Sequence, residues 1–98
     1  MEGNGRLFYY KNQKQEDVDF VIQKGLKITQ LIQVCYSLSG PKVKDREVRA
    51  LIKASAELNC SNMTIITNDL EGIETHSWFG NTGEITFIPL WKWFLTQA

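Results

Sequence analysis

Acidic and polar side chains alternate with apolar ones in two neighbouring stretches of this chain. The first stretch, residues 17–23 (DVDFVIQ), contains Asp19, and the second, residues 28–38 (ITQLIQVCYSL), has Gln33 and Cys35 at positions of one parity. Residues of one parity lie on one face of a β-strand, so we expect the acidic side chain to face polar side chains of the next strand. Carboxylate and amide oxygens are ligands for Mg²⁺, and a metal bound there would act on a phosphate.

A small sheet must position these side chains. Residues 6–11 (RLFYYK) are aromatic and aliphatic, which favours a first strand, and the polar residues 12–16 have the length of a hairpin connection. A turn containing Gly25 joins the two alternating stretches, so the first three strands are predicted to form an antiparallel meander.

A helix is predicted to follow the third strand. Ser39 and Pro41 are typical of a helix start, and residues 42–59 repeat apolar side chains with helical spacing. The apolar residues 63–67 (MTIIT) then predict a buried strand, parallel to the third because a helical crossover connects the two.

The remaining third of the chain has weaker patterns. We expect a turn at 68–72, an irregular segment at 73–83 with a short strand near 74–76, and a strand at 84–88, before Pro89 starts a short final helix. The predicted fold class is therefore α+β: a three-stranded antiparallel meander, one parallel strand after a crossover helix, and a short C-terminal helix.

Composition indicates one small domain that covers residues 1–98, with residues 1–5 as a frayed end. Eleven basic residues balance eleven acidic ones, so net charge does not support binding to nucleic acid or to an anionic membrane. No apolar run is long enough to span a bilayer, and the polar N-terminus does not resemble a signal peptide, so we expect a cytoplasmic protein. Cys35 and Cys60 lack metal-ligand spacing and are expected to be reduced thiols.

Motifs of common enzyme classes do not occur. The chain has no GxxxxGK[ST], GxSxG, HExxH or CxxC sequence, which argues against ATP hydrolysis by this chain alone and against common hydrolase, zinc-protease and redox chemistries.

Three runs carry a family resemblance: LFYYKNQKQEDVDFVIQKG, LIQVCYSLSGPKVKDREVRALIKASAELNCSNMTIIT and IPLWKWFL. They resemble the C-terminal domain of bacterial and archaeal AAA-type P-loop ATPases, a domain without a settled function. The resemblance implies a restriction-endonuclease-like fold of the PD-(D/E)xK superfamily. That superfamily also has a helix before its first strand, so we expect this chain to be a C-terminal fragment or a truncated relative of such an ATPase.

The superfamily motif implies specific roles for a few residues. Its first metal-binding acid matches Asp19, with Glu16 and Asp17 as auxiliary acids, and its (D/E)xK triplet begins at Gln33 and ends at Cys35. Glutamine offers a neutral carbonyl oxygen where the motif has a carboxylate, and a thiol offers no positive charge where the motif has lysine. The motif is therefore degenerate. A migrated lysine would restore it, and the candidates are Lys24, Lys27, Lys42 and Lys44.

Two functions are compatible with these residues. The preferred one is a non-catalytic, nuclease-like accessory domain of an AAA-type ATPase that binds nucleic acid or protein and needs no cofactor. The alternative is a metal-dependent nuclease with a rearranged site, in which Asp19 binds Mg²⁺ or Mn²⁺. The expected partner is the parent ATPase module or a second copy of the chain, and no membrane is involved.

Several side chains have both a structural and a functional interpretation. The weak candidates for contact with nucleic-acid phosphates are four basic residues of the predicted helix, Lys42, Lys44, Arg46 and Arg49. The simpler interpretation is that they form the solvated face of that helix. His76 is predicted to be an exposed loop residue rather than a metal ligand. Trp91, Trp93 and Phe94 cannot all point inward from a short helix, so we expect most of them in the core and at least one partly exposed, where it would mark a partner surface.

Overall fold

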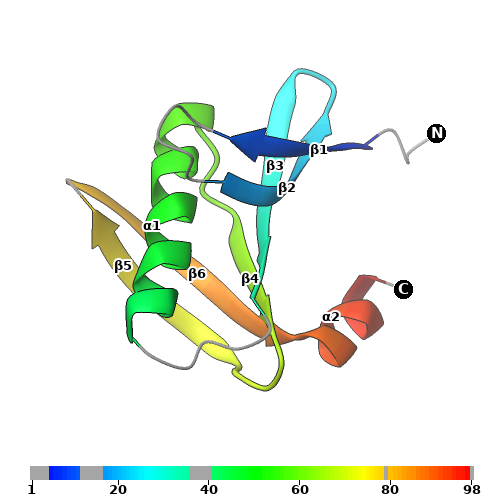
Figure 1. The fold of residues 1–98 in the computed structure, drawn as a ribbon. Coiled ribbons are helices and arrows are strands. Elements are labelled where there is room, and N and C mark those ends of the chain that lie inside the picture. Colours follow the sequence, from blue (N-terminus) through cyan, green and yellow to red (C-terminus); the bar gives the residue numbers. More distant parts are fainter. Residues whose placement is uncertain (1–4, 12–16, 36–40, 79, 98) are drawn as a thin grey trace.

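The chain forms one mixed sheet with two helices (Figure 1). The computed structural model describes residues 5–11, 17–35, 41–78 and 80–97. Predictions for residues 1–4, 12–16 and 36–40 lie outside this range, including those for the frayed end, the hairpin connection and the Ser39 cap. The elements, in chain order, are β1 (Gly5–Lys11), β2 (Asp17–Lys24), β3 (Lys27–Val34), α1 (Pro41–Leu58), β4 (Met63–Thr67), β5 (Gly72–Trp78), β6 (Asn81–Pro89) and α2 (Leu90–Gln97).

The N-terminal half of the sheet is antiparallel. β1 pairs with β2 and β2 with β3, both in antiparallel orientation. Gly25, in the turn between β2 and β3, has a φ of 64°, a value that glycine adopts without strain. Gly5, expected in the frayed end, is instead the first residue of β1.

The C-terminal half differs from the prediction. The six strands are ordered β1-β2-β3-β4-β6-β5, so the predicted meander and parallel strand account for only four of them. β4 pairs in parallel with both β3 and β6, and β5 forms an antiparallel edge on β6. The strands predicted near 74–76 and at 84–88 lie inside β5 and β6, but the irregular structure predicted for the rest of 73–83 is wrong, because both strands are longer than predicted. The coarser prediction, an α+β fold with a mixed sheet and two helices, is confirmed.

Both helices begin and end within one residue of their predicted bounds. α1 ends at Leu58 rather than Asn59, because Asn59 has a left-handed φ of 54°. The Cys60 N–H donates to the Ser55 carbonyl at 3.1 Å, which is the Schellman pattern of a helix C-terminus. α2 begins at Leu90 rather than Pro89, because Pro89 is still paired with β4 as the last residue of β6. Neither helix in the described ranges has the length and apolarity needed to span a bilayer.

The hydrophobic core lies between α1 and one face of the sheet. The inward side of α1 contributes Val48, Leu51 and Ile52, as the helical spacing predicts, and the sheet contributes fully buried residues from its four central strands. These strand residues are Val18, Val21, Leu31, Met63, Ile65, Ile85 and Phe87. α2 contacts β4 and β6, and Figure 1 shows it apart from α1. The sheet and α1 together fix the positions of the candidate site.

Candidate functional site

A β-bulge in β2 places Asp19. The pairing of β1 with β2 shifts between Phe8 and Tyr10, opposite Val21 and Val18, so that β2 has one residue more than β1 in this interval. Both valines are fully buried although they are three positions apart. The strict alternation predicted for this stretch is therefore wrong, because the bulge resets the parity of the strand next to Asp19.

Two hydrogen bonds connect Asp19 to the end of β3. The Asp19 N–H donates to the Gln33 side-chain Oε1 at 2.8 Å, and the Val34 N–H donates to Asp19 Oδ2 at 2.8 Å. The expected proximity of Asp19 and Gln33 is thus observed, although their roles as motif residues stay a prediction. In this arrangement, Gln33 Oε1, the oxygen that would bind a metal, already accepts a backbone hydrogen bond.

Glu47 of α1 also interacts with this pair of residues. Its carboxylate accepts a hydrogen bond from the Gln33 side chain and lies close enough to Asp19 for the two charges to interact. Since Gln33 Oε1 faces the Asp19 backbone, the amide nitrogen is the group that donates to Glu47. We call Asp19, Gln33 and Glu47 the carboxylate–amide cluster.

The electrostatics of the cluster follow from burial and charge. Burial is the largest influence on Glu47 and raises the pKa of its carboxyl group, as does the nearby charge of Asp19. The guanidinium of Arg46, whose Nη2 lies 3.8 Å from Glu47 Oε2, and the hydrogen bond from Gln33 oppose this rise in pKa. Glu47 therefore holds its proton more tightly than an exposed glutamate does.

Sequence reasoning missed Glu47. The signal was present, because Glu47 is four residues before Leu51 and so lies on the inward side of the helix with it. The prediction of this helix used only its apolar side chains and did not consider Glu47. Of the auxiliary acids, Glu16 lies outside the described residues, and Asp17 begins β2.

Cys35 has a packing role in the structure. β3 ends at Val34, so Cys35 lies just past the strand rather than inside it as predicted; residues 36–38 of the predicted strand lie outside the described residues. Its N–H donates to the Ile66 carbonyl at 2.9 Å, and its half-buried side chain packs against the core. Cys60 is a buried thiol. A thiol at the position of Cys35 supplies no cation for a phosphate.

Two of the four candidate lysines lie far from the cluster. Lys24 and Lys27 face each other across the turn between β2 and β3. Lys27 is six residues before Gln33 in the same strand, which corresponds to about 20 Å. Lys42 is exposed in the first turn of α1, five residues before Glu47, or about 7.5 Å along the helix axis.

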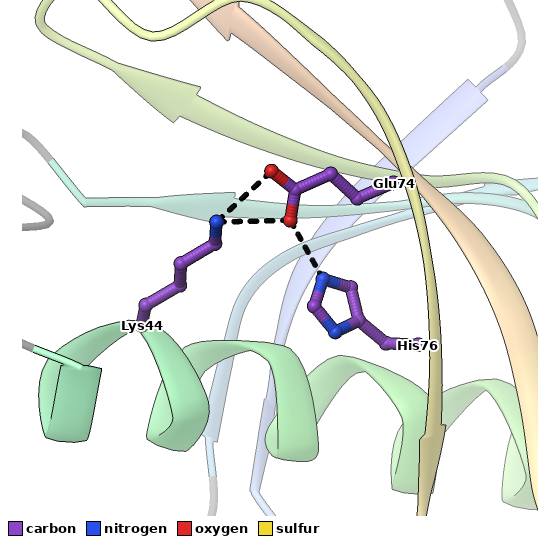
Figure 2. Close-up of polar contacts among 3 residues, drawn as sticks. All are labelled: Lys44, Glu74 and His76. Carbon is purple, nitrogen blue, oxygen red and sulfur yellow. Dashed lines mark hydrogen bonds and ion pairs between the residues drawn. The ribbon is translucent and has the colours of Figure 1, made fainter.

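Lys44, the fourth candidate, belongs to a separate polar group (Figure 2). Its Nζ lies 2.9 Å from both carboxylate oxygens of Glu74 on β5, and His76 Nε2 lies 2.8 Å from Glu74 Oε1. These contacts, that of Lys44 before that of His76, lower the pKa of the Glu74 carboxyl group. Lys44 Nζ also lies 5.2 Å from the centre of the Phe87 ring. The group joins α1 to the edge strand.

These contacts correct two predictions. His76, expected in a loop and exposed, lies in β5 and is half-buried against Glu74. Arg49, a candidate for phosphate contact, has its guanidinium carbon 5.1 Å from the centre of the Trp78 ring, a cation–π geometry. Among the four phosphate-contact candidates, Lys44 and Arg49 therefore help to pack α1 on the sheet, whereas Lys42 and Arg46 are exposed.

The cluster has limited capacity for metal chemistry as it stands. It offers two carboxylates and one amide, and within the described residues no group of three or more His, Cys, Asp or Glu side chains is placed to hold a metal ion. A cation would have to take Gln33 Oε1 away from the Asp19 N–H and Asp19 Oδ2 away from the Val34 N–H. What the observed geometry does is cross-link β2, β3 and α1.

Comparison with known proteins adds no assignment. No protein-family model matches the chain, and no curated protein or solved structure matches it either. The resemblance to an ATPase C-terminal domain therefore stays a prediction.

Proposed function

We propose that this chain is a non-catalytic, nuclease-like accessory domain of an AAA-type ATPase that serves in interaction or regulation. One observation carries the proposal: the oxygen and nitrogen of Gln33 are both used inside the carboxylate–amide cluster. A site built to hold Mg²⁺ would keep oxygen ligands available to the ion. Here the corresponding atoms stabilise the fold.

Further support for the restriction-endonuclease-like part of the proposal comes from topology. Three antiparallel strands, a helix and a strand parallel to the third follow one another in the chain, which is the order that the resemblance implies. Asp19 and Gln33 lie on the second and third of these strands, at the positions that match the motif.

The alternative, a metal-dependent nuclease with a rearranged site, is favoured by Glu47. Glu47 supplies a second carboxylate to the cluster, where the superfamily motif has one at the position of Gln33. This carboxylate comes from α1 rather than from β3. In that case Asp19, Glu47 and Gln33 Oε1 would hold Mg²⁺ or Mn²⁺, which stabilises charge that develops on a phosphodiester. Lys42 would be the migrated lysine, because Lys44 is paired with Glu74.

Calorimetric titration with Mn²⁺ separates the two functions. The proposal predicts no saturable binding that depends on Asp19 and no cleavage of single- or double-stranded DNA with Mg²⁺ or Mn²⁺. Asp19→Asn and Glu47→Gln test the cluster, and Asp45→Asn, an exposed acid on α1, is the matched control. Mn²⁺ binding and DNA cleavage that are lost in the two cluster variants and kept in the control would establish the nuclease and refute the proposal.

A further inference from the structure

Helix α2 exposes an apolar face. Trp91, Phe94 and Leu95 are 62%, 60% and 68% exposed, and their spacing of three and four residues places them side by side on the helix. We call these three residues the α2 patch. The prediction that at least one aromatic residue of this helix is exposed is confirmed, whereas the expectation that most of them lie in the core is wrong. Single exposed apolar side chains are ordinary, whereas adjacent ones indicate a binding surface.

The patch is held in a defined position and carries no unbalanced charge from its helix. Lys92, the charged residue of α2, pairs with Glu71 in the segment between β4 and β5. The helix also contacts β4 and β6. The half-buried Trp93 ring lies edge-on to the Phe94 ring, with 5.8 Å between the two ring centres. Because its support is fixed, the patch loses little conformational freedom when it binds.

We propose that the α2 patch is the surface through which two copies of this chain associate. The exposed apolar area of the patch supports a second copy as the partner. The three side chains expose on the order of 400 Å² per copy, which is within the range of functional patches on small proteins. Two such patches bury at most about 800 Å² in total, which is the area of a weak, transient interface.

Charge permits the same pairing. The chain has eleven basic and eleven acidic residues, so two copies approach each other without net repulsion. A two-fold pair uses the same patch on both copies, so one apolar surface covers the other. With this area, the expected complex is a weak dimer with a dissociation constant in the micromolar range. This inference does not depend on the proposed function.

Sedimentation velocity of the full chain, from low micromolar to near-millimolar concentration, tests the proposal. The unmodified chain is expected to shift reversibly from monomer to dimer. Phe94→Glu should raise the dissociation constant by about 30-fold or more, because both copies lose an anchor and gain like charges at the contact. Leu26→Glu is the matched control: Leu26 is fully exposed alone in the turn between β2 and β3, and the change in charge is the same.

A charge-swap experiment guards against misfolded variants. Phe94→Lys should also be monomeric, and mixing it with Phe94→Glu should restore a heterodimer. Circular dichroism melts of both variants should match those of the unmodified chain, since Phe94 is mostly exposed. A chain that stays monomeric at every concentration, or a dimer that survives Phe94→Glu, would overturn the proposal.

Discussion

Replacing Gln33 by glutamate tests whether the carboxylate–amide cluster depends on a neutral amide. The two side chains have nearly the same shape, and Gln33 is only 3% exposed, so the substitution changes charge and hydrogen bonding with little change in packing. The new carboxylate can still accept from the Asp19 N–H. It loses the donor to Glu47 and adds a third negative group beside Asp19 and Glu47.

The cost has an upper limit set by protonation. Two carboxylates about 5 Å apart repel by about 3 kcal/mol at an effective dielectric constant near 20, and the lost charge-assisted hydrogen bond is worth about 1.5–3 kcal/mol. Protonating one carboxyl group removes the repulsion and also restores the hydrogen bond, because the new O–H can replace the amide donor. At pH 7 that protonation costs about 3.7 kcal/mol for a reference pKa near 4.3. We therefore expect a destabilisation of about 2–4 kcal/mol at pH 7.

Lowering the pH should reduce this cost by up to about 1.4 kcal/mol per pH unit, so that little remains near pH 4.5. Urea unfolding of both chains at pH 7 and pH 5 measures the difference. Gln30→Glu is the matched control, since the Gln30 amide on the same strand donates to the Thr64 hydroxyl rather than to a carboxylate. If Gln33→Glu costs the same at pH 7 and pH 5, or costs nothing at pH 7, the reasoning about the cluster is refuted.

Three further predictions concern other parts of the fold. Because the folded-state pKa of Glu47 is raised, the stability contributed by its protonated form is present below the unfolded-state pKa and is lost as pH rises through the folded-state value. Glu47→Gln should therefore flatten the pH dependence of unfolding above about pH 4.5 and raise stability at neutral pH, whereas Glu57→Gln on the exposed side of α1 should do neither. Lys44→Met should speed amide hydrogen exchange in β5 because the ion pair that holds the edge strand is lost, and an unchanged rate, or an equal change in Lys42→Met, would contradict this role. Asn59→Ala should cost about 1 kcal/mol in chemical unfolding because φ is left-handed, whereas Asn59→Gly should cost nothing; equal losses would show that φ is not the cause.

The sequence predicted the elements whose patterns are local. The strand Met63–Thr67 was predicted with its observed bounds, because a short apolar run between turn residues has few other uses. α1 was right to one residue at each end, because apolar side chains at helical spacing are also a local pattern. Of β5, only a short strand near 74–76 was predicted, because GIETHSW is mostly polar and its full strand conformation depends on pairing with β6.

The site was predictable only in part. The expected contact of Asp19 with Gln33 required only two neighbouring strands in an approximate register, and the turn containing Gly25 that joins them indicates that register. Two features were not accessible to that reasoning. The bulge in β2 is decided by how both Val18 and Val21 reach the core, and Glu47 enters the cluster only once α1 is packed on the sheet. The bulge is a consequence of tertiary packing, whereas the helical spacing of Glu47 and Leu51 shows that Glu47 faces inward but not which residues it meets there.

The position of β4 has a consequence for how the chain folds. β1, β2 and β3 are neighbours in sequence, as are β5 and β6, so each group can form by short-range hairpin closure. β4 joins the two groups through parallel pairs on both sides, and its five residues are buried along the whole strand. Those pairs close only after long stretches of chain have been ordered, so we expect the docking of β4 to be the slow step. Its amides should then exchange only when the whole domain unfolds.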